Sequence, residues 1–234
     1  MSYTVTQGDI LDVQAQAVVV SVEMTMRVID GPVSQRLAAV GGDALREAIR
    51  RQRYIPVGSA RALEGAGLPF EQAIATAVPR WLNGKQNELL ILRRCYQNVY
   101  DIAEALGCET IAMPFLSATY YLFPREEAVH IALDAAEKRA IQTIFVADTP
   151  ALYSQSQQAY HKPEIVGYIG YYRDHAIFEL DNGLFVRVDL RPEVEEVEFT
   201  PYFEACYRTG VDPLQPPLPE AEIERLKGIY GKIG

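Results

Sequence analysis

This sequence of 234 residues contains little that favours a metal site, a disulfide framework or a membrane span. Its three cysteines are far apart and form no CxxC pair, and its three histidines are also scattered. Such thiols are typical of a reducing compartment. No apolar run approaches the ~20 residues that cross a bilayer, and the first residues lack the basic start and apolar segment of a signal peptide. We therefore expect a cytoplasmic protein that needs no metal or cofactor and does not enter a membrane.

Basic residues are also scarce relative to acidic ones. The chain has 22 lysines and arginines against 31 aspartates and glutamates, which gives a formal net charge of −9. A general nucleic-acid binder normally carries a basic face, so we do not expect general nucleic-acid binding. An anionic small ligand is not excluded, because backbone N–H groups and a helix N-terminus can hold phosphate without Lys or Arg.

Residues 1–150 alternate short β-rich runs with longer helical patterns, which predicts a layered α/β domain. The apolar run over residues 17–22 is typical of a strand covered on both faces. A helix is predicted over 34–53, with an interruption at Gly41-Gly42, because paired glycines weaken a helix. The remaining predictions are a hairpin over 59–63 and 72–78, a helix over 87–106, a strand over 110–114, a helix from Pro124 and a closing strand over 142–147.

The composition changes after Asp148. Residues 151–163 are assigned as a linker, within which the polar, Ser- and Gln-rich stretch 153–160 is typical of a linker or of an exposed helix end. Residues 164–234 are interpreted as a small β-rich module, with a three-stranded meander over 165–172, 176–180 and 184–189. The Asn-Gly pair at 182–183 favours a type I′ turn. A final helix is predicted from about Glu220, and this module could bind a protein partner.

Four segments of the first 148 residues resemble, in order, those of macrodomains, the ADP-ribose-binding family. The segments are Gly8-Asp9-Ile10; Ile29-Asp30-Gly31-Pro32-Val33; residues 68–69 with 75–81; and residues 92–96 and 107, followed by 110–117 and Pro124. The resemblance implies a three-layer α/β/α fold with a mixed sheet, and a ligand of the ADP-ribose type. It also implies ligand contacts from Asp9, Ile10, Gly31 and Val33, and from a phosphate loop made of Ser117, Ala118, Thr119, Tyr120, Tyr121, Leu122 and Phe123.

The sequence departs from the family pattern at the positions that matter for catalysis and for phosphate binding. Glu23 replaces the second asparagine of the family's Asn-Ala-Ala-Asn stretch, which orients the distal ribose and the attacking water in hydrolytic members. Residues 24–28 replace a Gly-Gly-Gly run, and the phosphate loop contains no glycine. Glycines let a backbone approach a diphosphate closely and adopt positive φ. Their loss therefore predicts a narrower, reshaped or lost cradle.

Each candidate site residue has a second interpretation. Asp9 could accept from adenine, or it could cap local N–H groups in a turn. Asp30 could be a catalytic acid or base, or the cap of the helix near Pro32. Glu23 could serve as a base, because a carboxylate beside Asp30 would raise one of the two pKa values, or it could be solvated at a strand end. The loop could hold phosphates, or the rings of Tyr120, Tyr121 and Phe123 could fill a vestigial pocket.

These alternatives lead to three functional hypotheses. The first is a binding module for ADP-ribose or a related nucleotide metabolite, without turnover. The second is an ADP-ribosyl hydrolase, or a hydrolase of another nucleotide derivative, that uses Asp30 and Glu23. The third is an interaction protein whose cleft is plugged by its own rings. The first is our main expectation, and it depends on the site more than on the fold.

Overall fold

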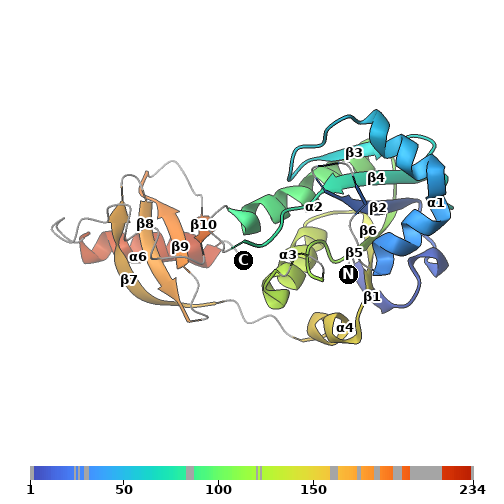
Figure 1. The fold of residues 1–234 in the computed structure, drawn as a ribbon. Coiled ribbons are helices and arrows are strands. Elements are labelled where there is room, and N and C mark those ends of the chain that lie inside the picture. The colour runs from blue at the N-terminus through green and yellow to red at the C-terminus, as the bar shows by residue number, and fades with distance from the viewer. Residues whose placement is uncertain are drawn as a thin grey trace. The chain divides into compact units, whose positions relative to one another are not determined.

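The computed structural model describes residues 3–23, 25, 27–28, 32–82, 87–119, 121, 123–158, 163–172, 175–181, 185–191, 197–200 and 218–232. The chain forms two compact units (Figure 1). The first unit comprises Met1–Trp81 and Ile91–Tyr160, and the second comprises Leu82–Leu90 and His161–Gly234. Each unit contains its own β-sheet. None of the helices in the described ranges is long and apolar enough to cross a membrane.

The first unit is built on a six-stranded sheet in the order β1-β6-β5-β2-β4-β3. Its strands are β1 (Tyr3–Gln7), β2 (Ala17–Val22), β3 (Ala60–Leu63), β4 (Gln72–Ala77), β5 (Thr110–Pro114) and β6 (Gln142–Ala147). Neighbouring strands are parallel except for β3, which runs antiparallel to β4 in the predicted hairpin. The sheet is therefore mixed, as predicted.

Helices cover both faces of this sheet, because parallel strands need crossover connections. Helix α1 (Pro32–Arg51) lies on one face, and α2 (Glu88–Ala105) and α3 (Arg125–Glu137) lie on the other (Figure 1). All six residues of β2 are buried, which agrees with its unbroken apolar run. The three-layer α/β/α fold is thus confirmed.

Helix α1 bends where the sequence predicts an interruption. Gly42 has a φ of 50° and a ψ of −133°, so two helical segments meet there. A positive φ of this kind is adopted readily only by a residue without a Cβ atom. On either side of the bend, Leu37 and Leu45 are fully buried in the core between α1 and the sheet.

The segment predicted as a linker begins with a short helix, α4 (Pro150–Ser156). Thr149 caps this helix, because its side chain accepts a hydrogen bond from the backbone N–H of Leu152. Pro150 follows at the first helical position, where a missing N–H costs nothing. The start of the 151–163 linker is therefore helical, and it contacts β1 and β6 of the first unit.

The second unit contains an antiparallel sheet in the order β10-β9-β8-β7. Its strands are β7 (Ile165–Tyr172), β8 (His175–Leu180), β9 (Phe185–Asp189) and β10 (Val197–Thr200), and α6 (Glu220–Lys232) follows. The sheet has four strands, so the predicted three-stranded meander was one strand short. Its core joins strand residues such as Phe178 and Val188 to Leu226, Ile229 and Tyr230 of α6. The predicted turn at Asn182-Gly183 lies outside the described residues.

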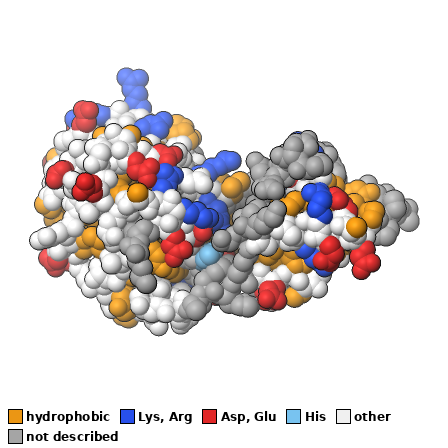
Figure 2. Space-filling model, turned by 180° about the vertical axis from the view of Figure 1, so that it is seen from behind, with side chains coloured by type: hydrophobic (Ala, Val, Ile, Leu, Met, Phe, Trp, Pro, Cys, Tyr) orange, Lys and Arg blue, Asp and Glu red, His pale blue; other side chains and the backbone are white. Residues whose placement is uncertain are grey.

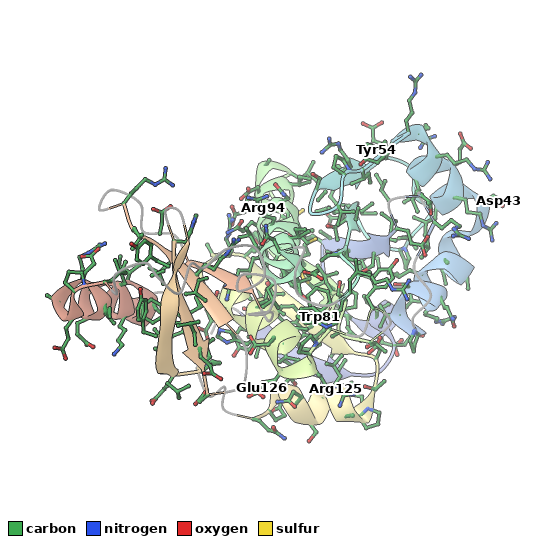
Figure 3. All side chains as sticks on the ribbon, turned by 60° about the vertical axis from the view of Figure 1, so that its left-hand side comes forward. Asp43, Tyr54, Trp81, Arg94, Arg125 and Glu126 are labelled. Carbon is green, nitrogen blue, oxygen red and sulfur yellow. The ribbon has the colours of Figure 1, made fainter. Side chains whose placement is uncertain are left out.

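Acidic and basic side chains are interspersed on the face that Figure 2 shows. On α1, Arg46 pairs with Asp43 and Arg50 pairs with Glu47. Asp43 projects from the outer side of that helix (Figure 3). Exposed pairs of this kind contribute little to stability. Because acidic and basic side chains are interspersed on the face that Figure 2 shows, they form no extended field of one sign there.

Candidate functional site

The parallel strands of the first sheet place several polar side chains at one edge. Strands β2, β4, β5 and β6 run in the same direction, so their carboxyl ends lie together. In open α/β sheets, ligands bind at this edge. Ser21 lies near the end of β2, Ser117 and Thr119 follow β5, and Asp148 directly follows β6.

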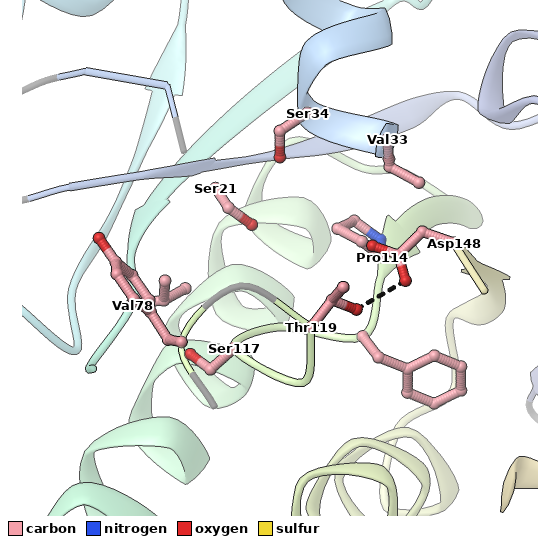
Figure 4. Close-up of a pocket in the computed structure, with 10 residues that line it drawn as sticks. Ser21, Val33, Ser34, Val78, Pro114, Ser117, Thr119 and Asp148 are labelled. Atoms are coloured by element: carbon pink, nitrogen blue, oxygen red, sulfur yellow. Dashed lines mark hydrogen bonds between the residues drawn. The ribbon is translucent and has the colours of Figure 1, made fainter. Parts of the chain in front are cut away.

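A hollow lies at this edge, between the start of α1 and the loop after β5 (Figure 4). Its cavity volume is about 30 Å³, and the figure rises to about 350 Å³ only when all space between atoms, including space open to solvent, is counted. The residues that line it are Ser21, Val33, Ser34, Val78, Pro114, Phe115, Ser117, Thr119, Tyr121 and Asp148. Four of them carry hydroxyl groups on Ser or Thr side chains, and Asp148 carries the single carboxylate in this set. The described lining therefore offers hydrogen-bonding groups but no lysine or arginine.

The loop after β5 is held by contacts to its neighbours on both sides. Ser117 has a φ of 62°, in the left-handed region, and its Oγ donates a 2.9 Å hydrogen bond to the carbonyl of Pro79. The backbone N–H of Leu116 donates to the hydroxyl of Tyr96 at 2.8 Å. Tyr96 is completely buried, as predicted for that face of its helix. Thus α2 and the end of β4 fix the backbone that forms one wall of the hollow.

Thr119 occupies a position where the family pattern has glycine. Its Oγ1 donates a 2.7 Å hydrogen bond to Oδ1 of Asp148, across the floor of the hollow (Figure 4). Burial raises the pKa of Asp148, and the hydrogen bonds from Thr119 and from its own backbone N–H partly oppose this shift. Where the family pattern has a glycine, which has no side chain, this chain therefore has a threonine side chain that is hydrogen-bonded to a carboxylate.

Asp9 follows β1 and acts as the cap of the short 3-10 helix η1 (Ile10–Asp12). Its Oδ1 accepts from the backbone N–H of Leu11 at 3.1 Å, and its Oδ2 pairs with Nε of Arg36 at 2.5 Å. The backbone hydrogen bond from Leu11 is the largest cause that lowers the pKa of Asp9, and Arg36 lowers it further. Asp9 is not among the residues that line the hollow, but Arg36 joins it to α1 one turn after Val33.

Glu23 is held by several donors at the end of β2. Its Oε2 accepts from the hydroxyl of Thr25 at 2.8 Å and from Nη2 of Arg27 at 3.2 Å. The Thr25 hydrogen bond is the largest cause that lowers the pKa of Glu23, with smaller contributions from Arg27 and Tyr121. Hydrogen-bond donors around Glu23 stabilise its charged form. The expectation that one carboxylate of the pair Asp30 and Glu23 has a raised pKa stays a prediction, because Asp30 lies outside the described residues.

Apart from Asp9 and Glu23, the predicted site residues fall into three groups. Val33, Ser117, Thr119 and Tyr121 line the hollow. Ile10, Ala118 and Phe123 are buried, and the ring of Phe123 packs edge-on against Trp81 with a centroid distance of 5.1 Å. Asp30, Gly31, Tyr120 and Leu122 lie outside the described residues, so their roles stay predictions.

Sequence reasoning missed three polar residues of the hollow: Ser21, Ser34 and Asp148. Ser21 and Ser34 are each 6% exposed and read as ordinary members of a strand and a helix. The position of Asp148 carried a usable signal, because it follows a predicted buried strand, and the carboxyl ends of parallel strands share one edge. Among the described residues, no group of three or more His, Cys, Asp or Glu is placed to hold a metal ion.

The three-layer α/β/α fold, with a polar hollow at the carboxyl edge of its sheet, defines the class of protein. Comparison with known proteins defines the family. The family model of the Macro domain matches residues 15–132. The chain belongs to the Macro domain family.

Relatives support this assignment along most of the first unit. An O-acetyl-ADP-ribose deacetylase 1 from Pantoea vagans is 35% identical over 151 residues, which cover 60% of this chain and 87% of the relative. A Macro domain-containing protein from Lactiplantibacillus plantarum is 31% identical over 145 residues, which cover 62% of this chain and 84% of the relative.

Solved structures show the same fold at lower identity. The Oceanobacillus iheyensis macrodomain with ADP superposes with a TM-score of 0.61 at 22% identity, covering 66% of this chain and 87% of that chain. The Trypanosoma brucei macrodomain in complex with ADP-ribose superposes with a TM-score of 0.58 at 22% identity, covering 66% and 67% respectively.

Proposed function

We propose that the protein binds ADP-ribose, or a related nucleotide metabolite, in the hollow at the carboxyl edge of the first sheet, without turning it over. The observation that carries this proposal is the hollow itself, which lies between the first turn of α1 and the loop after β5 in a chain of the Macro domain family. The solved macrodomain of Oceanobacillus iheyensis holds ADP, and that of Trypanosoma brucei is in complex with ADP-ribose.

The chemistry of the hollow suits an anionic and hydroxylated ligand. Val33 and Ser34 stand in the first turn of α1, where the helix dipole favours negative charge. The hydroxyls of Ser21, Ser34 and Thr119 can donate to or accept from ribose and phosphate oxygens. Asp9 keeps an ionised carboxylate at the neighbouring strand end, where it supports the proposed contact with an adenine amino group.

Isothermal titration calorimetry with ADP-ribose tests the proposal. We expect wild-type protein to bind, and Asp9→Ala to weaken binding roughly tenfold or more, because hydrogen bonds to charged groups are worth about 1.5–3 kcal/mol. Asp43→Ala is the matched control. It also removes an aspartate that pairs with an arginine of α1, but the Asp43 side chain is 98% exposed and faces away from the hollow's lining.

Thermal melting of both variants shows whether Asp9→Ala weakens binding through the site or through the fold, because loss of a helix cap alone costs about 0.5–2 kcal/mol. No heat and no thermal shift with wild-type protein at millimolar ADP-ribose would contradict the binding proposal. Equal affinity of wild type and Asp9→Ala would remove Asp9 from the site while leaving the hollow in place.

Hydrolysis is a second candidate function, favoured by relatives named O-acetyl-ADP-ribose deacetylase at 30–35% identity. Here Asp30 and Glu23 would carry the proton transfers. The lowered pKa of Glu23 leaves it ionised at neutral pH, which suits a base more than an acid. Wild type, Asp30→Ala and Glu23→Gln are compared on O-acetyl-ADP-ribose and on an ADP-ribosylated protein. Release at the same background level by all three would end this candidate.

The plugged-cleft alternative has less support from the described residues. The ring of Phe123 packs on Trp81 and is not among the residues that line the hollow, whereas Tyr121 is one of them and Tyr120 lies outside the described residues. An interaction role for the second unit stays a prediction, and a pull-down with residues 161–234 deleted against the full chain would test it.

A further inference from the structure

A carboxylate lies inside the hollow that would receive the phosphates. Asp148 is half-buried and lines the hollow together with Pro114, Phe115 and Thr119. It sits at the carboxyl end of β6, next to β5 in the sheet, so its side chain projects toward the loop after β5. A diphosphate bound against that loop would share the hollow with this carboxylate.

The described surroundings of Asp148 supply hydrogen bonds but no opposite charge. Thr119 Oγ1 donates to Oδ1 at 2.7 Å, and the remaining causes of its shifted pKa are burial and its own backbone N–H. Among the residues that the structure describes, no charged group contributes to that shift. An ionised Asp148 repels a second anion in the hollow, and the repulsion is stronger than in water because the local dielectric is lower.

We propose that Asp148 makes the binding of a diphosphate in this hollow depend on a proton, so that the site binds an anionic ligand tightly only when Asp148 is neutral. The inference rests on the proposed function and deepens it. Asp148 is then a specificity-determining residue, whose ionisation weakens the binding of ADP-ribose and leaves the binding of uncharged nucleosides unaffected.

The other titratable groups near the hollow do not reproduce this effect. Among the lining residues, only Tyr121 is also titratable, and the pKa of Glu23, which contacts Tyr121, is lowered. Strand β5 and the short helix α4 contain no acidic, basic or histidine residue, and neither does β1. On α1, Arg36 pairs with Asp9, whose pKa is lowered. The first turn of α3 carries Arg125, Glu126 and Glu127, which contribute nothing to the shift of Asp148.

The sign of the pH dependence follows from linkage. Burial raises the pKa of Asp148 in the free protein, and a bound diphosphate raises it further because it disfavours the charged form. Affinity therefore falls as pH rises through the interval between these two pKa values, by up to about tenfold per pH unit for one linked proton. Both phosphates of ADP-ribose are esterified, so the ligand itself does not titrate there.

Calorimetry from about pH 4 to about pH 8 tests this proposal, because the pKa of Asp148 is raised above its ordinary value of 3.8. The probes are ADP-ribose and the uncharged nucleoside adenosine, and the proteins are wild type, Asp148→Asn and Asp43→Asn. Asparagine keeps the shape of aspartate and can still accept from Thr119, so the fold is expected to survive, and thermal melting verifies it. Asp43→Asn removes a negative charge at a side chain that is 98% exposed.

For wild type and Asp43→Asn, we expect the affinity for ADP-ribose to fall with rising pH. For Asp148→Asn, we expect a flat profile and at least tenfold tighter binding near pH 8. Adenosine should bind all three proteins alike at every pH.

Three results would overturn the inference. If wild type and Asp148→Asn bind ADP-ribose equally at every pH, the inference fails and the proposed function stands. If Asp148→Asn binds more weakly, the carboxylate accepts from a ligand hydroxyl and does not repel a phosphate. If adenosine shows the pH dependence of ADP-ribose, the linked proton is unrelated to ligand charge. Binding by none of the proteins at any pH would refute both proposals.

Discussion

Substitution of Ser117 tests the conformation of the loop that forms one wall of the hollow. Its φ of 62° lies in the left-handed region, which costs a residue with a Cβ atom about 1–2 kcal/mol. Its Oγ offsets this cost by donating to the buried Pro79 carbonyl. We predict that both Ser117→Ala and Ser117→Gly destabilise the first unit, and that the glycine variant is the more stable of the two.

The magnitudes follow from these two contributions. Ser117→Ala keeps the unfavourable φ and removes a buried hydrogen bond, for a loss of about 1–3 kcal/mol. Ser117→Gly loses the same bond but relieves the backbone, and the greater freedom of glycine in the unfolded chain cancels about 0.4–1 kcal/mol of that relief. The glycine variant should therefore be more stable than the alanine variant by up to about 1.6 kcal/mol.

Urea unfolding followed by the fluorescence of Trp81 measures this difference. Trp81 is the single tryptophan of the chain, and its backbone N–H donates to the carbonyl of Tyr121 in the same loop. Ser34 provides the matched control, because it lies in α1, where alanine is favoured over glycine. An alanine variant of Ser117 that is as stable as wild type, or more stable than the glycine variant, would refute the reasoning.

Three further outcomes follow from the structure. Gly67→Ala should destabilise the first unit more than Gly107→Ala in urea unfolding. Both glycines have positive φ, but of the two only Gly67 would place a Cβ atom 2.9 Å from a neighbouring side chain. Equal losses of stability would contradict this prediction. Burial raises the pKa of Cys95 to about 12, so its peptide should stay unalkylated by iodoacetamide in the folded protein, and native labelling would contradict the burial. Arg191 lowers the pKa of Asp189 from 3.8 to about 2, so Asp189 stabilises the second unit above pH 3.8 and loses this effect as pH falls toward 2. Asp189→Asn should abolish that acid sensitivity in hydrogen exchange of β8 and β9, and an unchanged profile would count against it.

Local patterns predicted most of the first unit. The interruption of α1 at Gly42, the hairpin of β3 and β4, and the buried β2 all depend on residues close together in the sequence. For helix α4 the sequence does not decide between a linker and a helix end, because seven residues give almost no periodicity, although Thr149-Pro150 carries the signal of a capped helix start. The strand order of the sheet depends on long-range pairing, which composition and periodicity do not encode.

The family resemblance predicts where the candidate site lies in the fold. It does not predict which polar side chains line it. The resemblance placed Val33 and the loop after β5 at the ligand, and the structure brings Val33, Ser117 and Thr119 to one hollow. The pair formed by Thr119 and Asp148 joins residues 29 positions apart. Such a contact appears only when β5 and β6 are known to be neighbours, so the acidic floor of the hollow needed the structure.

A crystal structure of the protein grown with saturating ADP-ribose tests the central claim most directly. The account predicts density for the diphosphate between the first turn of α1 at Val33 and the loop at Ser117–Thr119, within reach of Asp148. Ligand density elsewhere, such as the separate hollow along α1 near Arg46 and Arg50, or an empty carboxyl edge at saturating ligand, would contradict it.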